Sequence, residues 1–235
     1  AVVNARKNFL TRCQAMEMAM DALIQQGRLA RGGVVELRGN GQLLKRSMLE
    51  KCGGFNEDTV TDDLDLSFRL LTSGALVGIL WDPPVQEEAV ETFSALLRQR
   101  QRWAEGGLQR FFDYWPLLIS RRLNFSQKQD LASFFLLQYA LPVVSFADLL
   151  TTLITRTIPA YWPLSIVAFS ISGLAYWRGC KSISEGPALP SPRPLTLLMA
   201  IVYLSHWFII IPWATFRMAL FPKKLTWAKT DHHGI

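Results

Sequence analysis

The sequence predicts an α/β catalytic part, followed by an interfacial helix and an α-helical transmembrane region. Half of the 235 residues are hydrophobic, only 19% are charged, and the formal net charge is +6. This composition excludes a disordered chain and leaves few charges to coat a soluble surface. Charge is also concentrated in the first half. We therefore expect four parts, with boundaries at residues 1–105, 106–128, 129–220 and 221–235.

The first part has the mixed periodicity of an α/β domain. Apolar residues at helical spacing predict three helices, over residues 8–26, 64–73 and 91–105. Two short apolar runs, 34–37 and 77–81, predict strands. The first run leads into Gly39-Asn40-Gly41, which indicates a turn, and Pro83-Pro84 ends the second.

The second part predicts a helix that lies on a membrane surface. Residues 108–123 interleave aromatic and aliphatic side chains with Arg110, Arg121 and Arg122. Apolar and basic side chains on one helix are typical of segments bound at the interface of an anionic bilayer.

The third part contains three stretches that are long enough to cross a bilayer. Residues 131–155 carry a single charged side chain, Asp148, and the stretches 157–177 and 194–216 carry none. A helix needs roughly 20 apolar residues to span the hydrocarbon core. The alternative, three buried helices of a large soluble protein, is disfavoured because nothing else in the chain could cover them.

The number of these stretches conflicts with the distribution of positive charge. Basic residues place both the connection 178–194 and the tail 221–235 on the cytoplasmic side. Three crossings cannot achieve this if the first half is cytoplasmic too. We expect 131–155 to fail to cross, because Pro142 removes a helical hydrogen bond and Asp148 is costly at mid-membrane.

The acidic cluster Asp62, Asp63 and Asp65 is the first candidate for chemistry. Acidic residues at a helix start cap free N–H groups, and taken alone this structural role is favoured. The other interpretation is a catalytic base, because neighbouring carboxylates raise one another's proton affinity. A metal-binding Asp-x-Asp motif is disfavoured, since this cluster enters a helix instead of following a strand.

The second candidate is Gln99, Arg102 and Trp103, which share one helix face at positions i, i+3 and i+4. A guanidinium can neutralise a departing diphosphate, and an indole can stack on a sugar ring. The alternative is a basic interfacial helix with an anchoring tryptophan. Metal binding by the terminal pair His232 and His233 is rejected, and three scattered cysteines are too few for a zinc site or a disulfide framework.

Taken together and in order, these motifs resemble the family 2 glycosyltransferases of the inverting GT-A type. Within that family the similarity is to members that attach glucose to diacylglycerol. It is densest at residues 34–115, and Trp227-x-Lys229-Thr230 matches near the end. The matching strings cover residues 36–42, 52–54, 61–66, 85–88 and 102–107.

The resemblance implies that the chain is the C-terminal part of a GT-A enzyme. Such an enzyme would transfer glucose from UDP-glucose to diacylglycerol with inversion, on the cytoplasmic side of the cell or thylakoid membrane, and would bind no nucleic acid. The sequence begins with Ala1, and we expect the ligands for Mg²⁺ to lie mainly upstream of it, with no metal site in this part. This part alone is therefore expected to be inactive.

The resemblance also implies roles for individual residues. Asp63 corresponds to the base, with Asp62 beside it. The residues that face the acceptor and the diphosphate would be Gly39, Asn40, Gly41, Gln99, Arg102 and Trp103. Trp227, Lys229 and Thr230 would cover the nucleotide.

Two other functions stay open. A processive polysaccharide synthase that uses UDP-glucose or UDP-N-acetylglucosamine would share these motifs, although it tends to need more spans. A non-catalytic membrane component, such as a transporter subunit, would leave the acidic and Gln-Arg-Trp motifs unexplained.

Overall fold

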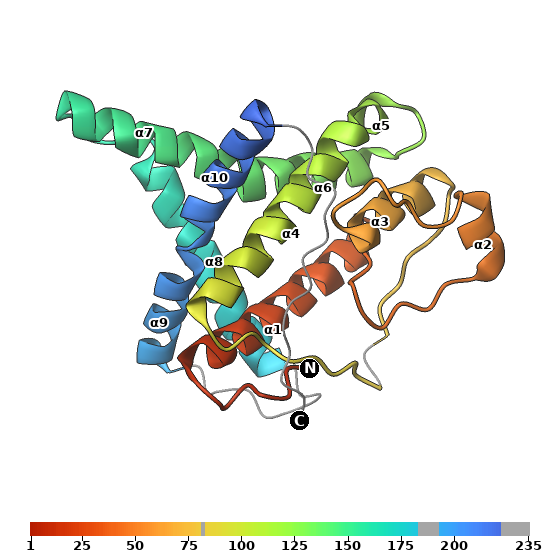
Figure 1. Cartoon of the computed structure of the whole chain (residues 1–235), viewed down its shortest axis with the longest axis horizontal. Coiled ribbons are helices and arrows are strands. Elements are labelled where there is room, and N and C mark those ends of the chain that lie inside the picture. Colours follow the sequence, from red (N-terminus) through yellow and green to blue (C-terminus); the bar gives the residue numbers. More distant parts are fainter. Residues whose placement is uncertain (81–82, 183–192, 222–235) are drawn as a thin grey trace.

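The computed structural model describes residues 1–80, 83–182 and 193–221, and these residues are almost entirely helical or irregular (Figure 1). The order along the chain is α1 (Phe9–Ala30), α2 (Arg46–Lys51), α3 (Asp62–Thr72), α4 (Phe93–Asp113), α5 (Trp115–Ile119), α6 (Phe125–Phe135), η1 (Leu136–Ala140), α7 (Leu141–Thr155), α8 (Trp162–Ser182), α9 (Pro194–Leu204) and α10 (Trp207–Leu220). The predicted helices of the first part are present as α1, α3 and α4.

The two predicted strands are not formed in the described residues, so the α/β class is not confirmed. The backbone N–H groups of Val34, Glu36 and Leu37 donate to side chains of the surrounding helices instead of to a neighbouring strand. Val34 donates to Asp130 Oδ2 at 2.9 Å, and Leu37 donates to Ser67 Oγ at 2.7 Å. In the other run Leu80 is 78% exposed, whereas Val77 and Ile79 are half-buried, and no described strand pairs with the run. An extended run becomes a strand only when a second strand pairs with it.

Helices α1 and α4 form the centre of the molecule (Figure 1). A capping box starts α1: Thr11 N–H donates to Asn8 Oδ1 at 2.9 Å, and Asn8 N–H donates to Thr11 Oγ1 at 3.1 Å. Helix α1 packs against α8 and α9, whereas α4 packs against α3 and α10. The first-half helices and the apolar helices therefore share one interior.

The segment 106–128 is not a single helix, contrary to our expectation. Helix α4 continues to Asp113, and its residues Leu108 and Phe111 are each only 2% exposed, so this part faces the protein interior. Short α5 follows, and α6 begins at Phe125 after the cap residue Asn124. The large apolar side chains of this segment that are exposed, Phe112, Trp115, Ile119 and Phe125, lie in α5 or in the residues that flank it.

Two helical stretches, Phe125–Thr155 and Pro194–Leu220, are long and apolar enough to cross a membrane among the residues that the structure describes. The first comprises α6, η1 and α7. It contains the stretch 131–155, which we expected not to cross the membrane. A π-helical turn over Leu136–Ala140 comes directly before Pro142. Such a turn widens the backbone locally and accommodates a proline without breaking the helix.

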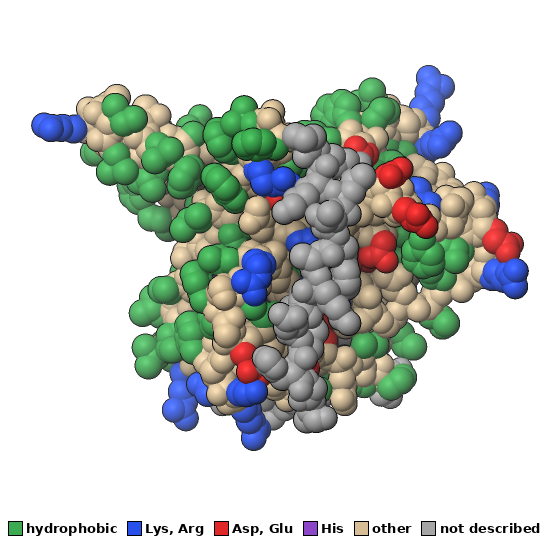
Figure 2. Space-filling view, in the orientation of Figure 1, with side chains coloured by type: hydrophobic (Ala, Val, Ile, Leu, Met, Phe, Trp, Pro, Cys, Tyr) green, Lys and Arg blue, Asp and Glu red, His purple; other side chains and the backbone are tan. Residues whose placement is uncertain are grey.

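Helix α8 covers most of the predicted span 157–177. Unlike those two stretches, it is not both long and apolar enough to be a candidate for crossing a membrane. Serine and glycine interrupt its apolar sequence, and α1 packs along it. The side chain of Asp148 accepts a hydrogen bond from Tyr161 N–H at 2.9 Å, just before α8. Apolar side chains gather over α7, α9 and α10, while acidic side chains gather on the side of α2 and α3 (Figure 2).

Candidate functional site

Every predicted site residue that lies in the described part of the chain lines one cavity of about 1730 Å³. These residues come from three segments: the turn at residues 39–41, the start of α3 and the middle of α4. They are Gly39, Asn40, Gly41, Asp62, Asp63, Gln99, Arg102 and Trp103. The predicted nucleotide-covering residues Trp227, Lys229 and Thr230 lie outside the described residues.

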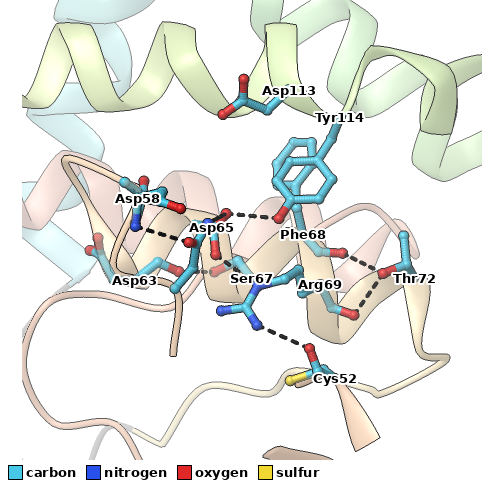
Figure 3. A network of polar contacts seen from close by, with 12 residues as sticks. Cys52, Asp58, Asp63, Asp65, Ser67, Phe68, Arg69, Thr72, Asp113 and Tyr114 are labelled. Carbon is cyan, nitrogen blue, oxygen red and sulfur yellow. Dashed lines mark hydrogen bonds and ion pairs between the residues drawn. The ribbon is translucent and has the colours of Figure 1, made fainter. Parts of the chain in front are cut away.

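The three carboxylates of the acidic cluster have different surroundings, and Figure 3 shows two of them, Asp63 and Asp65. Asp65 is 3% exposed and fully engaged: Tyr114 OH donates to its Oδ1 at 2.7 Å, and Arg69 Nε donates to its Oδ2 at 2.7 Å. Asp62 is exposed at the first position of α3, as expected for a residue that complements a helix start. Asp63 lines the cavity and is half-buried.

The pKa of Asp63 is raised above the ordinary carboxyl value. Burial is the largest cause, and the charge of Asp62 adds to it. A backbone hydrogen bond from Leu64 and the charges of Arg38 and Arg110 act in the opposite direction and do not cancel it. A raised pKa brings a carboxylate closer to the proton affinity that a general base needs near neutral pH.

The turn at residues 39–41 approaches Asp63 closely. A Cβ placed on Gly39 would lie 3.8 Å from Asp63 Oδ2. Gly41 has a φ of +65°, and a Cβ there would meet Val85 Cγ2 at 2.3 Å. Asn40 extends from the same turn to Glu87, with 3.3 Å between Nδ2 and Oε2. Glycine at position 41 thus lets the turn form against Val85 and beside the acidic cluster.

A buried cluster around Glu36 fixes the backbone that leads into this turn. Arg110 Nη1 lies 2.8 Å from Glu36 Oε1, and Arg28 Nη1 lies 3.6 Å from Glu36 Oε2. Burial acts to raise the pKa of Glu36, but the charges of Arg110, Arg28 and Arg38 lower it below the ordinary value. The glutamate is therefore held as an anion between α1 and α4.

On α4, Arg102 and Trp103 line the cavity. Burial lowers the pKa of Arg102, and the charge of Asp63 partly opposes this effect. The guanidinium of Arg100 lies over the Trp103 ring, 4.1 Å from its centroid. A cation against one face of an indole holds the ring in place by a cation–π contact. This contact restricts the orientation of the Trp103 side chain.

Arg100 belongs to a second buried cluster, which the sequence analysis missed. Arg100 Nη2 donates to Glu17 Oε2 at 2.5 Å, Tyr203 OH donates to the same oxygen at 2.8 Å, and Trp207 Nε1 donates to Glu17 Oε1 at 3.0 Å. Arg100 is fully buried. The one feature of the sequence that could have indicated this cluster is Glu17, a glutamate among the apolar residues of α1. The cluster joins α1 and α4 to the apolar helices α9 and α10.

Helix α4 is also bound to α10 further along. Arg217 of α10 donates to Glu105 of α4 with two nitrogens, and the Nε to Oε1 distance is 2.6 Å. Gly106 follows Glu105, and a Cβ there would lie 2.2 Å from Thr61 Oγ1. Glycine at position 106 therefore allows α4 to touch the residue that precedes the acidic cluster.

The described residues do not fit a metal ion. No group of three His, Cys, Asp or Glu side chains in that part of the chain is placed to hold one. Asp65 is already occupied by Arg69 and Tyr114, which leaves Asp62 and Asp63 as the remaining carboxylates of the cluster.

Comparison with known proteins supports the resemblance. The family model described as glycosyl transferase family group 2 matches residues 1–221. Beta-monoglucosyldiacylglycerol synthase of Synechocystis sp. is 47% identical over 99% of this chain and 50% of its own length. The protein of the same name from Trichormus variabilis is 40% identical over 100% of this chain and 51% of its length.

A more distant relative, poly-beta-1,6-N-acetyl-D-glucosamine synthase of Staphylococcus epidermidis, is 23% identical over 99% of this chain and 60% of its own length. The chain spans about half the length of the first two relatives. No solved structure matches it significantly. With a family match over residues 1–221, the chain belongs to glycosyl transferase family group 2.

Proposed function

We propose that the protein containing this chain transfers glucose from UDP-glucose to the free hydroxyl of diacylglycerol, with inversion at the anomeric carbon. The observation that carries the proposal is the cavity itself. It joins Asp63 and Arg102 to apolar side chains of α6, α8 and α10, such as Phe134, Phe169 and Phe208. A lipid acceptor needs both ends, since its hydroxyl must meet a base while its chains stay out of water.

The carboxylate of Asp63 accepts the proton of the acceptor hydroxyl. The hydroxyl oxygen forms the new bond to the anomeric carbon, the bond from that carbon to the diphosphate breaks, and its electron pair leaves with UDP. The guanidinium of Arg102 lines the same cavity and stabilises the negative charge that develops on the diphosphate. A single base is sufficient, because inversion takes one displacement.

The names of the relatives favour this acceptor over the alternatives. The relatives at 47% and 40% identity are named as synthases of a glucosyl lipid, whereas the one named as a polysaccharide synthase is 23% identical. Mg²⁺ stays part of the proposal as a cofactor of the whole protein, with its ligands outside the described residues.

Expression of the whole gene in a host that lacks glucolipids tests the proposal. Extracted lipids should contain β-glucosyl-diacylglycerol when the wild type is expressed, and at most traces of it when Asp63→Asn is expressed. An insoluble polymer in place of the glycolipid would indicate a polysaccharide synthase. Expression without either product would contradict an enzymatic function.

We also propose that α5 and its neighbours rest on the cytoplasmic membrane surface. The exposed side chains there combine apolar and basic types, as an interfacial segment requires. They are Phe112, Trp115, Ile119, Arg121, Arg122 and Phe125. Replacing Arg121 and Arg122 by alanine should weaken binding to anionic lipid by about 1 kcal/mol for each arginine. Arg46→Ala, on exposed α2, should change nothing.

The side of the tail can be measured directly. A cysteine at residue 235, in a protein whose three native cysteines are replaced by serine, should resist an impermeant thiol reagent in intact cells. Two crossings, one for each of the long apolar stretches, would return the chain to the side on which it started. Ready labelling from outside would contradict a cytoplasmic tail and a nucleotide role for Trp227, Lys229 and Thr230.

A further inference from the structure

The cavity has an apolar arm that the chemistry at Asp63 does not use. Beyond Trp103 its walls come from three places in the second half: the end of α6 with η1 and the start of α7, the middle of α8, and the α9–α10 junction. The lining side chains there include Phe134, Leu137, Pro142, Phe169, Leu204 and Phe208. Phe169 and Phe208 stack with their centroids 4.7 Å apart, which closes the wall between α8 and α10.

Small residues on one face of α8 create the space. Ala168 and Ser172 line the arm one helical turn apart, and Ser172 Oγ donates to Ala168 O at 2.9 Å, so the hydroxyl does not require a partner inside the arm. Next to them, a Cβ on Gly173 would already be 3.3 Å from Ile201 Cδ1. Helix α8 thus contacts α9 closely at Gly173 and leaves a hollow beside it.

The arm reaches the surface at the π-helical turn. Leu137 of η1 lines the cavity and is 59% exposed, so its side chain borders both the hollow and the molecular surface. The opening belongs to Phe125–Thr155, one of the two stretches that are long and apolar enough to span a bilayer. An entrance at this position faces lipid when that stretch is in the membrane.

From this geometry we infer that the arm binds an acyl chain of the acceptor lipid, which enters sideways past Leu137 and lies along Ala168 and Ser172. This inference rests on the proposed function and adds the route and the seat of the lipid. The aliphatic and aromatic side chains of its walls favour an acyl chain over a glucan. The arm belongs to the same cavity as Asp63, so a lipid bound in it can reach the base. The acceptor hydroxyl is then placed at Asp63 by burial of its chain.

A matched pair of serine variants on α8 tests the inference. Ser172→Phe fills the arm, whereas Ser170→Phe adds the same ring at an exposed position that does not line the cavity. With the full-length protein in detergent, Ser172→Phe should raise the KM for dioleoylglycerol by roughly tenfold, as expected for displacing about two methylene groups from an apolar wall. The KM values for dioctanoylglycerol and UDP-glucose should stay within about twofold, a small part of a kcal/mol.

Ser170→Phe should behave as the wild type with all three substrates. An equal effect of Ser172→Phe on both diacylglycerols, or no effect on either, would overturn the acyl-chain site. Ala168→Leu, a smaller change in the same arm, provides the comparison if Ser172→Phe does not fold.

A binding measurement separates this inference from the proposed function. Dioleoylglycerol with a diazirine in one acyl chain should label Ser172 or Phe169, and excess unlabelled dioleoylglycerol should suppress that label while leaving labels on exposed residues unchanged. Label that does not compete would overturn the site. If the wild type makes no glucosyl-diacylglycerol, the proposed function fails, and competition at Ser172 or Phe169 then decides the arm independently.

Discussion

Asp63 and Asp65 lie two residues apart at the start of α3, yet their surroundings differ in almost every respect. Asp65 is enclosed by Arg69, Tyr114 and Asn56, and its two oxygens are bound. Asp63 lines the large cavity, and no ion pair with another described residue holds its carboxylate. Adjacent carboxylates can therefore serve different purposes: one is satisfied for stability, and the other keeps its affinity for a proton.

The largest expected effect is on catalysis by Asp63→Asn in the full-length enzyme. The amide cannot take a proton from the acceptor, and general-base catalysis typically contributes ~10²–10⁴-fold, so kcat should fall by that factor. Binding of UDP-glucose, measured by calorimetry, should be retained. Asp62→Asn is the matched control and should keep most activity. If Asp62→Asn were the inactive variant, the base would be misassigned.

The next effect is on stability, by Asp65→Ala. Removal of one partner from a buried ion pair costs about 3–5 kcal/mol, and the partly exposed Arg69 places this pair near the lower limit. Denaturant unfolding in detergent should show the loss, while the kcat of the molecules that remain folded changes little. A stable protein with no activity would mean that Asp65 takes part in the chemistry.

A smaller effect is expected from Tyr114→Phe, which deletes one hydrogen bond to Asp65. A hydrogen bond to a charged group contributes about 1.5–3 kcal/mol, and Asp65 keeps its contact with Arg69. The free energy of unfolding should fall by less than in Asp65→Ala. In Tyr114→Phe combined with Asp65→Ala the two losses should not add, because both remove the same interaction.

The smallest expected effect is a pH-dependent difference in melting temperature between Asp63→Asn and the wild type. Because the pKa of Asp63 is raised in the folded protein, folding favours its protonated form, and that contribution to stability is lost as pH rises through the folded pKa. Asp63→Asn is neutral at every pH. Its melting temperature should exceed that of the wild type at neutral pH, and the gap should close below about pH 4, the ordinary carboxyl range. A gap that is constant with pH would contradict the raised pKa.

The sequence predicted local features well. Helices α1, α3 and α4 follow from periodicity and capping within one segment, and the i, i+3, i+4 spacing placed Gln99, Arg102 and Trp103 on one face, which the structure directs to the cavity. Helical order depends on neighbours in sequence, so local patterns are sufficient to recognise it.

Features that depend on distant partners could not be predicted. Val34 and Leu37 read as strand residues, but Asp130 and Ser67 take their N–H groups. Glu17 reads as one acidic residue in an apolar run, and its three donors come from α4, α9 and α10. Pro142 was expected to disturb the helix over 131–155, but the helix continues through a π-helical turn, which a proline alone does not predict.

The two adjacent glycines of α4, Gly106 and Gly107, limit the substitutions that this protein can accept. Glycine inside a helix is less stable than alanine by about 1 kcal/mol, which makes such positions attractive for thermostabilisation. Here a single added methyl group would lie 2.2 Å from Thr61 Oγ1 at Gly106, or 2.0 Å from Tyr139 OH at Gly107. Gly27, on an exposed face of α1 with open space around it, is the position where alanine can be introduced. Alanine at Gly106 or Gly107 would therefore not stabilise α4, because these glycines allow the helix to contact Thr61 and Tyr139.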